Sequence, residues 1–221
     1  MAGAQPNRIR TSTLKSRIMN TAQTSVYQVK LQPPQEVISF LQSGSRGFNY
    51  SNSGLDVELM CKSVTLPGQS LFTHETVNDY RGVTEKMAYR KNYSEVNFTF
   101  MVNNSYDVVE MFDGWVDFVA GNEEDQSEYF SPAASYRMNY PNSYKTDVFI
   151  TKFEKNAQLG GDINFSTRLI NESSFLMEYA LVGAFPLSIN ASTVSYEKSD
   201  VLTYDVSMAF TRYVRRRGRV S

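Results

Sequence analysis

The feature that most constrains the fold of this chain is an alternation of apolar and small polar residues near its C-terminus. Between positions 202 and 211, one row is Leu202, Tyr204, Val206, Met208 and Phe210, and the other is Thr203, Asp205, Ser207, Ala209 and Thr211. Successive side chains of a strand point to opposite faces, so a period of two predicts a strand with two different faces. We expect the apolar row to pack in the core beneath a helix. The strand is expected to run straight on through Tyr213 into the terminal arginines.

The residues before this strand also have the pattern of a sheet. An apolar strand is expected from Glu178, followed by the segment Gly183-Ala-Phe-Pro-Leu-Ser-Ile-Asn190 and by a short strand near Val194–Tyr196. This block of sequence therefore indicates architecture and not chemistry.

Four earlier segments also carry the pattern of strands, namely Val26–Leu31, Leu55–Ser63, Ser94–Val102 and Tyr144–Glu154. The first ends at Pro33-Pro34, because proline lacks the N–H that a ladder requires. Residues 42–54 have the composition of a loop. In the second strand, alternate residues are expected to point inward: Leu55, Val57, Leu59 and Cys61.

Residues 71–91 are predicted to be extended, but neither face is apolar. Thr73, Glu75 and Val77 share one face, and Phe72, His74 and Thr76 share the other. Strands of this kind do not hold their register or fold alone. We therefore expect neighbours to stabilise them, and these neighbours include other subunits.

One helix is predicted after Asn104. Its apolar residues recur at helical spacing: Val108, Met111, Phe112, Trp115, Val116 and Val119. Asn104 or Ser105 is the expected N-cap, and Gly121-Asn122 is the expected end.

Together these elements predict an α+β fold that is mainly antiparallel β. The expected subunit is a β-sandwich or barrel with one packed α-helix. Residues 1–23 are expected to form a basic flexible N-terminal arm, residues 24–213 a single domain, and residues 214–221 an arginine-rich C-terminal tail. Within the domain, residues 122–143 and 155–173 read as loop insertions.

Charge is distributed unevenly along the chain. The full chain has a formal net charge of −1, but residues 1–23 and 212–221 hold nine of its 22 basic residues and none of its 23 acidic ones. The middle of the chain therefore has 13 basic and 23 acidic residues, a net charge of −10. Such a body repels a phosphate backbone, whereas the basic ends attract one.

Catalytic and metal-binding chemistry finds little support in the sequence. His74 is the only histidine and Cys61 the only cysteine, so a zinc site of several convergent ligands is not predicted. Cys61 is expected to be a buried structural thiol, and the acidic run Glu123-Glu124-Asp125 a solvated turn. Phosphate-binding and nucleophile-elbow motifs are missing from the sequence. We expect no enzyme activity and no cofactor, and no membrane insertion by the subunit.

The order of these pieces resembles a known family. The segments that carry the resemblance are Cys61-Lys-Ser-Val-Thr-Leu-Pro67, Val96-Asn-Phe-Thr-Phe-Met-Val102, Gly183-Ala-Phe-Pro186 and Val194-Ser-Tyr-Glu197, with the long closing strand after them. Over residues 25–213 the chain is similar to the tail tube proteins of contractile-tailed bacteriophages, and the type VI secretion tube proteins of bacteria are similar too.

The resemblance implies a structural virion protein. Six copies are expected to join their sheets into one continuous inner β-barrel, and the resulting rings stack into a tube that carries DNA during genome ejection. The implied partners are other copies of the chain, the tail sheath protein, and the baseplate and terminator proteins. DNA is expected to pass through the lumen without specific binding. The expected location is the phage tail, assembled in the host cytoplasm.

Two sets of residues are candidates for sites in such a tube. Glu75, Asp79 and Glu85 are predicted to lie on or near the lumen, where acidic groups repel passing phosphates. The C-terminal arginines are predicted to contact an acidic neighbour, either the next ring or the sheath: Arg215, Arg216, Arg217 and Arg219. The alternative, that these arginines form a frayed tail that only adds solubility, has about equal weight.

Two other functions remain open from the sequence. One is the tail tube initiator of the baseplate, which has the same fold and forms a single ring. The other, from a different class, is a nucleic-acid-binding module with basic arms, which is distinguished by salt-dependent retention on DNA.

Overall fold

The computed structural model describes residues 24–43, 48, 50–76, 84–121, 138–153, 175–190, 194, 196 and 200–219. The chain divides into two compact units. The larger consists of Gln28–Thr151 and Glu178–Arg216, and the smaller of Met1–Tyr27, Lys152–Met177 and Arg217–Ser221.

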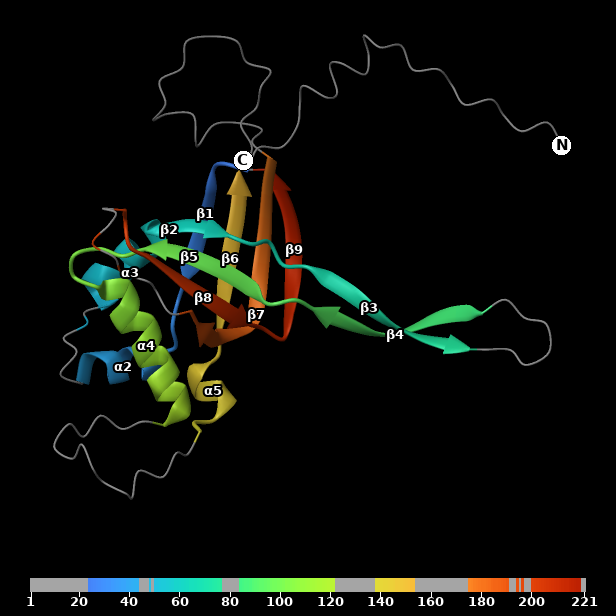
Figure 1. Cartoon of the computed structure of the whole chain (residues 1–221), viewed down its shortest axis with the longest axis horizontal. Helices are drawn as coiled ribbons and strands as arrows, with labels where there is room; N and C mark the ends of the chain where they lie inside the picture. The colour runs from blue at the N-terminus through green and yellow to red at the C-terminus, as the bar shows by residue number, and fades with distance from the viewer. Residues whose placement is uncertain are drawn as a thin grey trace, which may run out of the picture. The chain divides into compact units, whose positions relative to one another are not determined.

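Nine strands and four helices make up the described part of the chain (Figure 1). The strands are β1 (Tyr27–Leu31), β2 (Cys61–Val64), β3 (Gln69–Thr76), β4 (Glu85–Tyr93), β5 (Val96–Met101), β6 (Thr146–Phe153), β7 (Phe175–Ile189), β8 (Thr203–Ala209) and β9 (Arg212–Arg219). The helices are α2 (Gln35–Ser43), α3 (Tyr50–Leu59), α4 (Asp107–Ala120) and α5 (Pro141–Tyr144). The mainly antiparallel α+β class that the sequence predicts is confirmed in these elements.

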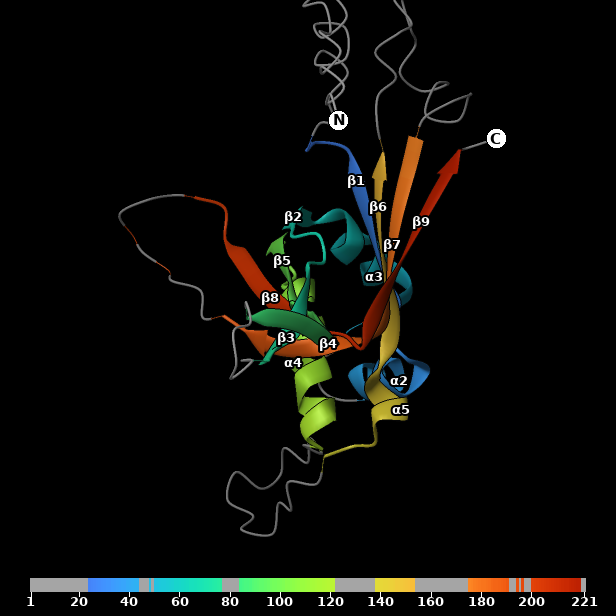
Figure 2. The same ribbon diagram turned by 90° about the vertical axis from the view of Figure 1, so that its right-hand side faces the viewer.

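Seven strands form one sheet, in the order β1-β6-β7-β8-β5-β2, and β9 also pairs with β7. Strand β7 bends (Figure 2) at Gly183, whose φ of 65° lies in the left-handed region. After the bend, β7 pairs with β8, with Phe185 opposite Ala209. Before the bend, the Thr211 N–H donates to the Val182 carbonyl at 3.0 Å. Strand β9 begins at the next residue, Arg212.

The core of the larger unit lies between α4 and strands β5 and β8. Phe98, Phe100, Phe112 and Trp115 are all fully buried, and the Phe100 and Phe112 ring centroids are 5.0 Å apart. The Trp115 Nε1–H donates to the Tyr144 carbonyl at 3.0 Å, so the buried indole keeps a hydrogen-bond partner. The prediction that the apolar row of the 202–210 strand packs in the core is confirmed at its centre: Tyr204, Val206 and Met208 are buried.

The helix predicted after Asn104 is α4, and it ends as expected. Gly121 has a φ of 71°, and its N–H bonds to carbonyls of the last turn. Its beginning differs from the prediction, because Tyr106 is the N-cap residue and makes no side-chain cap bond. The Asp107 N–H instead bonds to Asn103 Oδ1 at 3.0 Å, so a side chain one position before the predicted caps satisfies it.

The strand predicted for Leu55–Ser63, with its inward row of four residues, is wrong. Residues Tyr50–Leu59 form helix α3, and only the segment from Cys61 onward is a strand. Val57 is buried as expected, but Leu59 is 77% exposed. A short alternation of apolar and polar residues in the sequence does not distinguish a strand from a helix that buries one residue per turn. The same finding corrects the predicted 42–54 loop, whose last residues begin α3.

Helix α2 is absent from the sequence-based prediction of one helix. Val37 and Leu41 are fully buried one turn apart, and the Ile38 N–H bonds to the Pro34 carbonyl at 3.0 Å. Pro33-Pro34 therefore marks a helix start as well as a strand end, because proline is well tolerated where helix N–H groups have no intrahelical partner.

The closing strand does not run straight into the arginines. Strand β8 ends at Ala209, and a separate strand β9 begins at Arg212. The predicted strand at Val194–Tyr196 is also wrong, because Val194 and Tyr196 lie outside any strand and are 81% and 111% exposed. Residue Asp79, the arm 1–23 and the insertion 155–173 lie outside the described residues.

Few residues of the smaller unit are described. The Lys152 ammonium donates to the Ser25 and Phe153 carbonyls at 2.8 Å each, and the Phe153 N–H donates to the Val26 carbonyl at 3.1 Å. The bonds to Ser25 and Val26 join two segments that are far apart in sequence.

None of the helices in the described residues is long and apolar enough to cross a membrane.

Candidate functional site

Strands β3 and β4 form a two-stranded hairpin separate from the seven-stranded sheet (Figure 1). Its register runs from Gln69 opposite Tyr93 to Thr76 opposite Glu85, with Tyr89 as an extra residue at a bulge. Every residue of β3, and every residue of β4 up to Lys91, is exposed. The prediction that residues 71–91 are extended is confirmed for the described part of this segment.

The hairpin places the predicted acidic residues on different faces. Glu75 lies opposite Lys86, and their side chains form an ion pair of 2.8 Å. Glu85 lies opposite Thr76, the neighbour of Glu75, and so belongs to the other face. Because the Glu75 and Lys86 side chains are 52% and 63% exposed, their pair contributes at most about 1 kcal/mol to stability.

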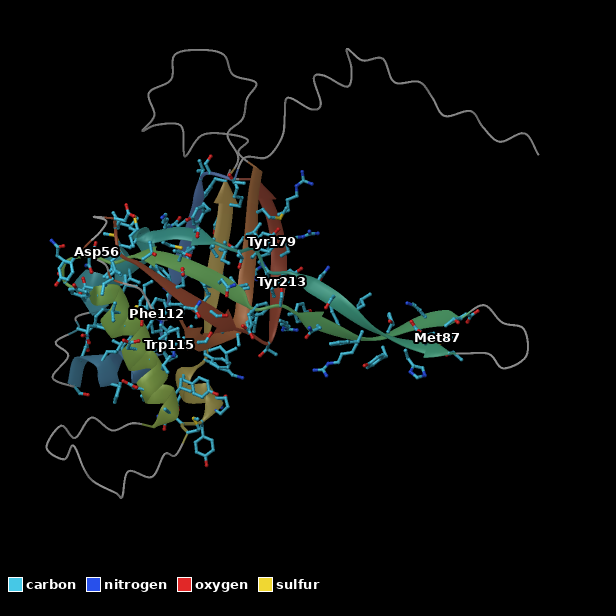
Figure 3. The ribbon with its side chains drawn as sticks, viewed as in Figure 1. Asp56, Met87, Phe112, Trp115, Tyr179 and Tyr213 are labelled. Carbon is cyan, nitrogen blue, oxygen red and sulfur yellow. The ribbon has the colours of Figure 1, made fainter. Side chains whose placement is uncertain are left out.

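One face of the hairpin carries an apolar stripe, which the sequence pattern did not reveal. Phe72 and Tyr89 have ring centroids 6.4 Å apart, and Met87 lies opposite His74 further along the hairpin (Figure 3). Phe72 is 45% exposed, Met87 56% and Tyr89 69%. The stripe depends on the register of β3 against β4, which sets Met87 opposite His74 and brings Tyr89 beside Phe72, and the sequence alone does not give this register.

An aromatic cluster joins the base of the hairpin to the sheet. The Tyr93 ring centroid is 5.4 Å from that of Tyr213 and 5.9 Å from that of Phe210. Tyr213 also contacts Tyr179 of β7 at 6.0 Å, and the Lys91 ammonium lies 5.2 Å from the Tyr93 ring centroid. These rings come from three separate segments, so they set where the hairpin leaves the sheet (Figure 3).

The arginines of the C-terminus belong to β9. Arg215 and Arg216 are exposed, and Arg216 lies 3.8 Å from the Glu178 carboxylate of the neighbouring strand. By strand alternation Arg215 shares the face of Tyr213, and Arg216 lies on the opposite face. Arg217 is also exposed, and Arg219 ends the strand. These residues are therefore presented by a paired strand.

The described residues hold no group of three or more His, Cys, Asp or Glu side chains that could bind a metal ion. His74 is exposed on the hairpin, in agreement with its polar surroundings in the sequence. Cys61 is half-buried, and its Sγ lies 3.5 Å from the Ser63 carbonyl oxygen, so the predicted fully buried thiol is wrong. The irregular pairing of β2 with β5 next to Cys61 accounts for this exposure.

Comparison with known proteins decides the family. The family model described as "Phage tail tube protein" matches residues 22–216. The chain belongs to the phage tail tube protein family. This confirms the resemblance drawn from the strand order and the closing segments. No curated protein matches the sequence.

Two solved structures share the fold of this chain. A chain of an extracellular contractile injection system, the PVC sheath-tube complex in the extended state, matches at 14% identity with a TM-score of 0.50. The match covers 94% of this chain and 99% of that one. A chain of the anti-feeding prophage tube-terminating cap matches at 10% identity with a TM-score of 0.51, over 90% and 92% of the two chains. The crystal structure of an Hcp protein matches at 12% identity with a TM-score of 0.39, over 87% and 96%.

Proposed function

We propose that this tail tube protein is the subunit of the inner tube of a contractile phage tail. Six copies form a ring in which their sheets join into one barrel, and the rings stack into a conduit for DNA during ejection. The role is structural, and no catalytic step is assigned to the chain. The observation that carries this proposal is the β3–β4 hairpin, which is exposed along β3 and along β4 up to Lys91.

The hairpin has the properties of an element that is completed by a neighbour. An isolated two-stranded sheet is marginally stable in water, and its unpaired edges invite further strands. Its exposed apolar stripe of Phe72, Met87 and Tyr89 adds surface that is unfavourable in water. A second copy of the chain that covers this stripe removes both costs, and a ring provides such a copy to every subunit.

The acidic residues of the hairpin suit a lumen. We assign Glu75, Asp79 and Glu85 to positions on or near the channel, where their charges repel DNA phosphates. Glu75 and Glu85 lie on opposite faces of the hairpin but at the same end of it. We therefore assign this end, and not one face, to the position near the channel. Passing DNA then meets few cations, and each Lys or Arg placed against a phosphate adds affinity that would hold the DNA back.

The β9 arginines are assigned to contacts with an acidic neighbour, either the next ring or the sheath. The sheath, baseplate and terminator proteins are the proposed partners. The matched PVC and anti-feeding prophage chains come from a sheath-tube complex and a tube-terminating cap, which supports partners of these kinds. The proposed location is the phage tail. A single initiator ring with the same fold is distinguished by its copy number per particle.

The decisive experiment is negative-stain electron microscopy of the purified full chain and of two matched variants. We expect the wild-type protein to form rings or hollow rods. Tyr89→Ser removes an aromatic ring from the hairpin stripe and is expected to reduce rod formation at least tenfold. Tyr140→Ser is the control, because Tyr140 is similarly exposed, 73% against 69% for Tyr89, but lies outside the hairpin.

Loss of rods in both variants, or in neither, contradicts the role of the hairpin. A wild-type protein that shows no rings and binds DNA at near-physiological salt instead supports the nucleic-acid-binding alternative.

A further inference from the structure

In the order of strands that the described residues form, β1 lies at one end of the seven-stranded sheet and β6 is its neighbour. The N–H groups on the outer side of such an edge strand are donors that an added strand requires. At the end of β1, the Leu31 N–H donates instead to Glu58 Oε1 at 2.8 Å. This bond joins two residues 27 positions apart, so it is formed by tertiary structure and not by a local turn.

Helix α3 holds the Glu58 carboxylate in place. Val57 beside it is 1% exposed, and the Met60 N–H bonds to the Asp56 carbonyl at 2.9 Å where the helix ends. Partial burial raises the pKa of Glu58, while the Leu31 N–H and the positive charge of Lys30 act in the opposite direction. Burial therefore opposes the charge of a carboxyl group that lies against the backbone of an edge strand.

We propose that Glu58 closes the β1 edge of this sheet against strand addition by a second copy of the chain. The Glu58 carboxyl group, held by α3, occupies the donor that an incoming strand needs. Exposed Lys30 on the same strand adds a charge of the kind that protects natural edges. Copies of the chain are thereby directed to other surfaces. This inference does not depend on the proposed tube.

The test separates the reach of the side chain from its charge. Glu58→Gln keeps an acceptor oxygen at the same distance, and Glu58→Asp keeps the charge but is shorter by one methylene. Hydrogen exchange at the Leu31 amide and sedimentation over a range of concentrations are measured in the full chain. We use the Tyr89→Ser background, in which association through the hairpin is reduced.

In dilute solution, we expect the Leu31 amide to exchange at least tenfold faster in Glu58→Asp than in the parent. At higher concentration, we expect Glu58→Asp to self-associate, and this association protects the Leu31 amide from exchange again. Glu58→Gln is expected to match the parent in both measurements. Asp56→Asn, an exposed change on the same helix, is the control and is expected to have no effect.

Four results overturn the proposal, three from Glu58→Asp and Asp56→Asn and one from Glu58→Gln. The first is unchanged exchange in Glu58→Asp. The second is faster exchange without any association, which reduces Glu58 to an anchor of α3. The third is equal association in Asp56→Asn. The fourth is loss of protection of the Leu31 amide in Glu58→Gln, which would contradict the role of the acceptor oxygen. Circular dichroism of each variant establishes that it is folded.

Discussion

At the scale of single residues, one hydrogen bond between polar side chains ties helix α4 to the sheet. The Tyr204 hydroxyl of β8 donates to Asp113 Oδ1 on α4. Tyr204 is 8% exposed, so its hydroxyl depends on this partner. Burial, followed by the bond to Asp113 and its negative charge, raises the pKa of Tyr204 above its ordinary value.

Tyr204→Phe is expected to lower the free energy of unfolding by about 1–3 kcal/mol, because Asp113 loses a donor while the ring stays in place. Since the pKa of Tyr204 is raised in the folded state, the stabilisation is fully present below the unfolded pKa of about 10 and is lost as pH rises through the folded value. Denaturant unfolding at pH 7 and pH 9 should therefore give the same difference. Tyr140→Phe, at an exposed position, is the control; an equal loss in both variants would contradict the assignment.

Sequence reasoning at this scale succeeded where a residue acts through its neighbours in the chain. Gly121 ends α4 because glycine adopts the left-handed conformation at little cost, which is a local property. It failed at Glu58 and Asn103, whose roles depend on which backbone groups the fold brings beside them. Glu58 has its partner 27 positions away, and no local pattern indicates such a pair.

At the scale of elements, the hairpin and its aromatic base are the parts that carry the functional argument. The hairpin has almost no buried contacts of its own, so its orientation depends on Tyr93 and the rings around it. The strands β5 and β8 and the helix α4 were predicted from their periodicity, because each has a long apolar row. Helix α3 was mistaken for a strand because its buried positions are few.

Tyr93→Ala is expected to loosen the hairpin without unfolding the core. Removal of this ring takes away its contacts with Phe210 and Tyr213, while the buried residues of α4 and β5 are untouched. Hydrogen exchange in β3 and β4 should become faster, and rod formation should fall, with the thermal midpoint changed by only a few degrees. Tyr196→Ala, at a fully exposed position, is the control. An unchanged exchange rate in the hairpin would show that the cluster does not hold it.

At the scale of the whole molecule, charge separates the C-terminal strand from the rest of the chain. Residues 212–219 hold five arginines and no acidic residue, whereas the middle of the chain has an excess of acidic residues. Because β9 pairs with β7, these charges are held on a strand, so truncation would remove structure as well as charge. Substitution is therefore the better test of the proposed contact with the next ring or the sheath.

Arg215→Gln is expected to lower the salt concentration at which rods dissociate, or at which sheath protein is released from them, by about twofold. The reason is that a screened intermolecular ion pair is lost. Arg216→Gln is the matched comparison and is expected to have a smaller effect, because Arg216 already lies 3.8 Å from the Glu178 carboxylate within the same subunit. Salt titration followed by light scattering and electron microscopy measures both. Equal effects of the two substitutions would contradict a specific role for Arg215.

The sequence by itself determined the elements with long, regular apolar rows, the class of the fold and the resemblance to tail tube proteins, since periodicity and strand order are properties of the chain alone. Tertiary structure decided the rest. It turned the terminal arginines back along β7 at Thr211, paired β3 with β4 in a register that sets Tyr89 beside Phe72, and brought Glu58 to the edge of β1. The physical reason is that these features depend on pairing between distant segments, where a bend or one extra residue changes which groups meet.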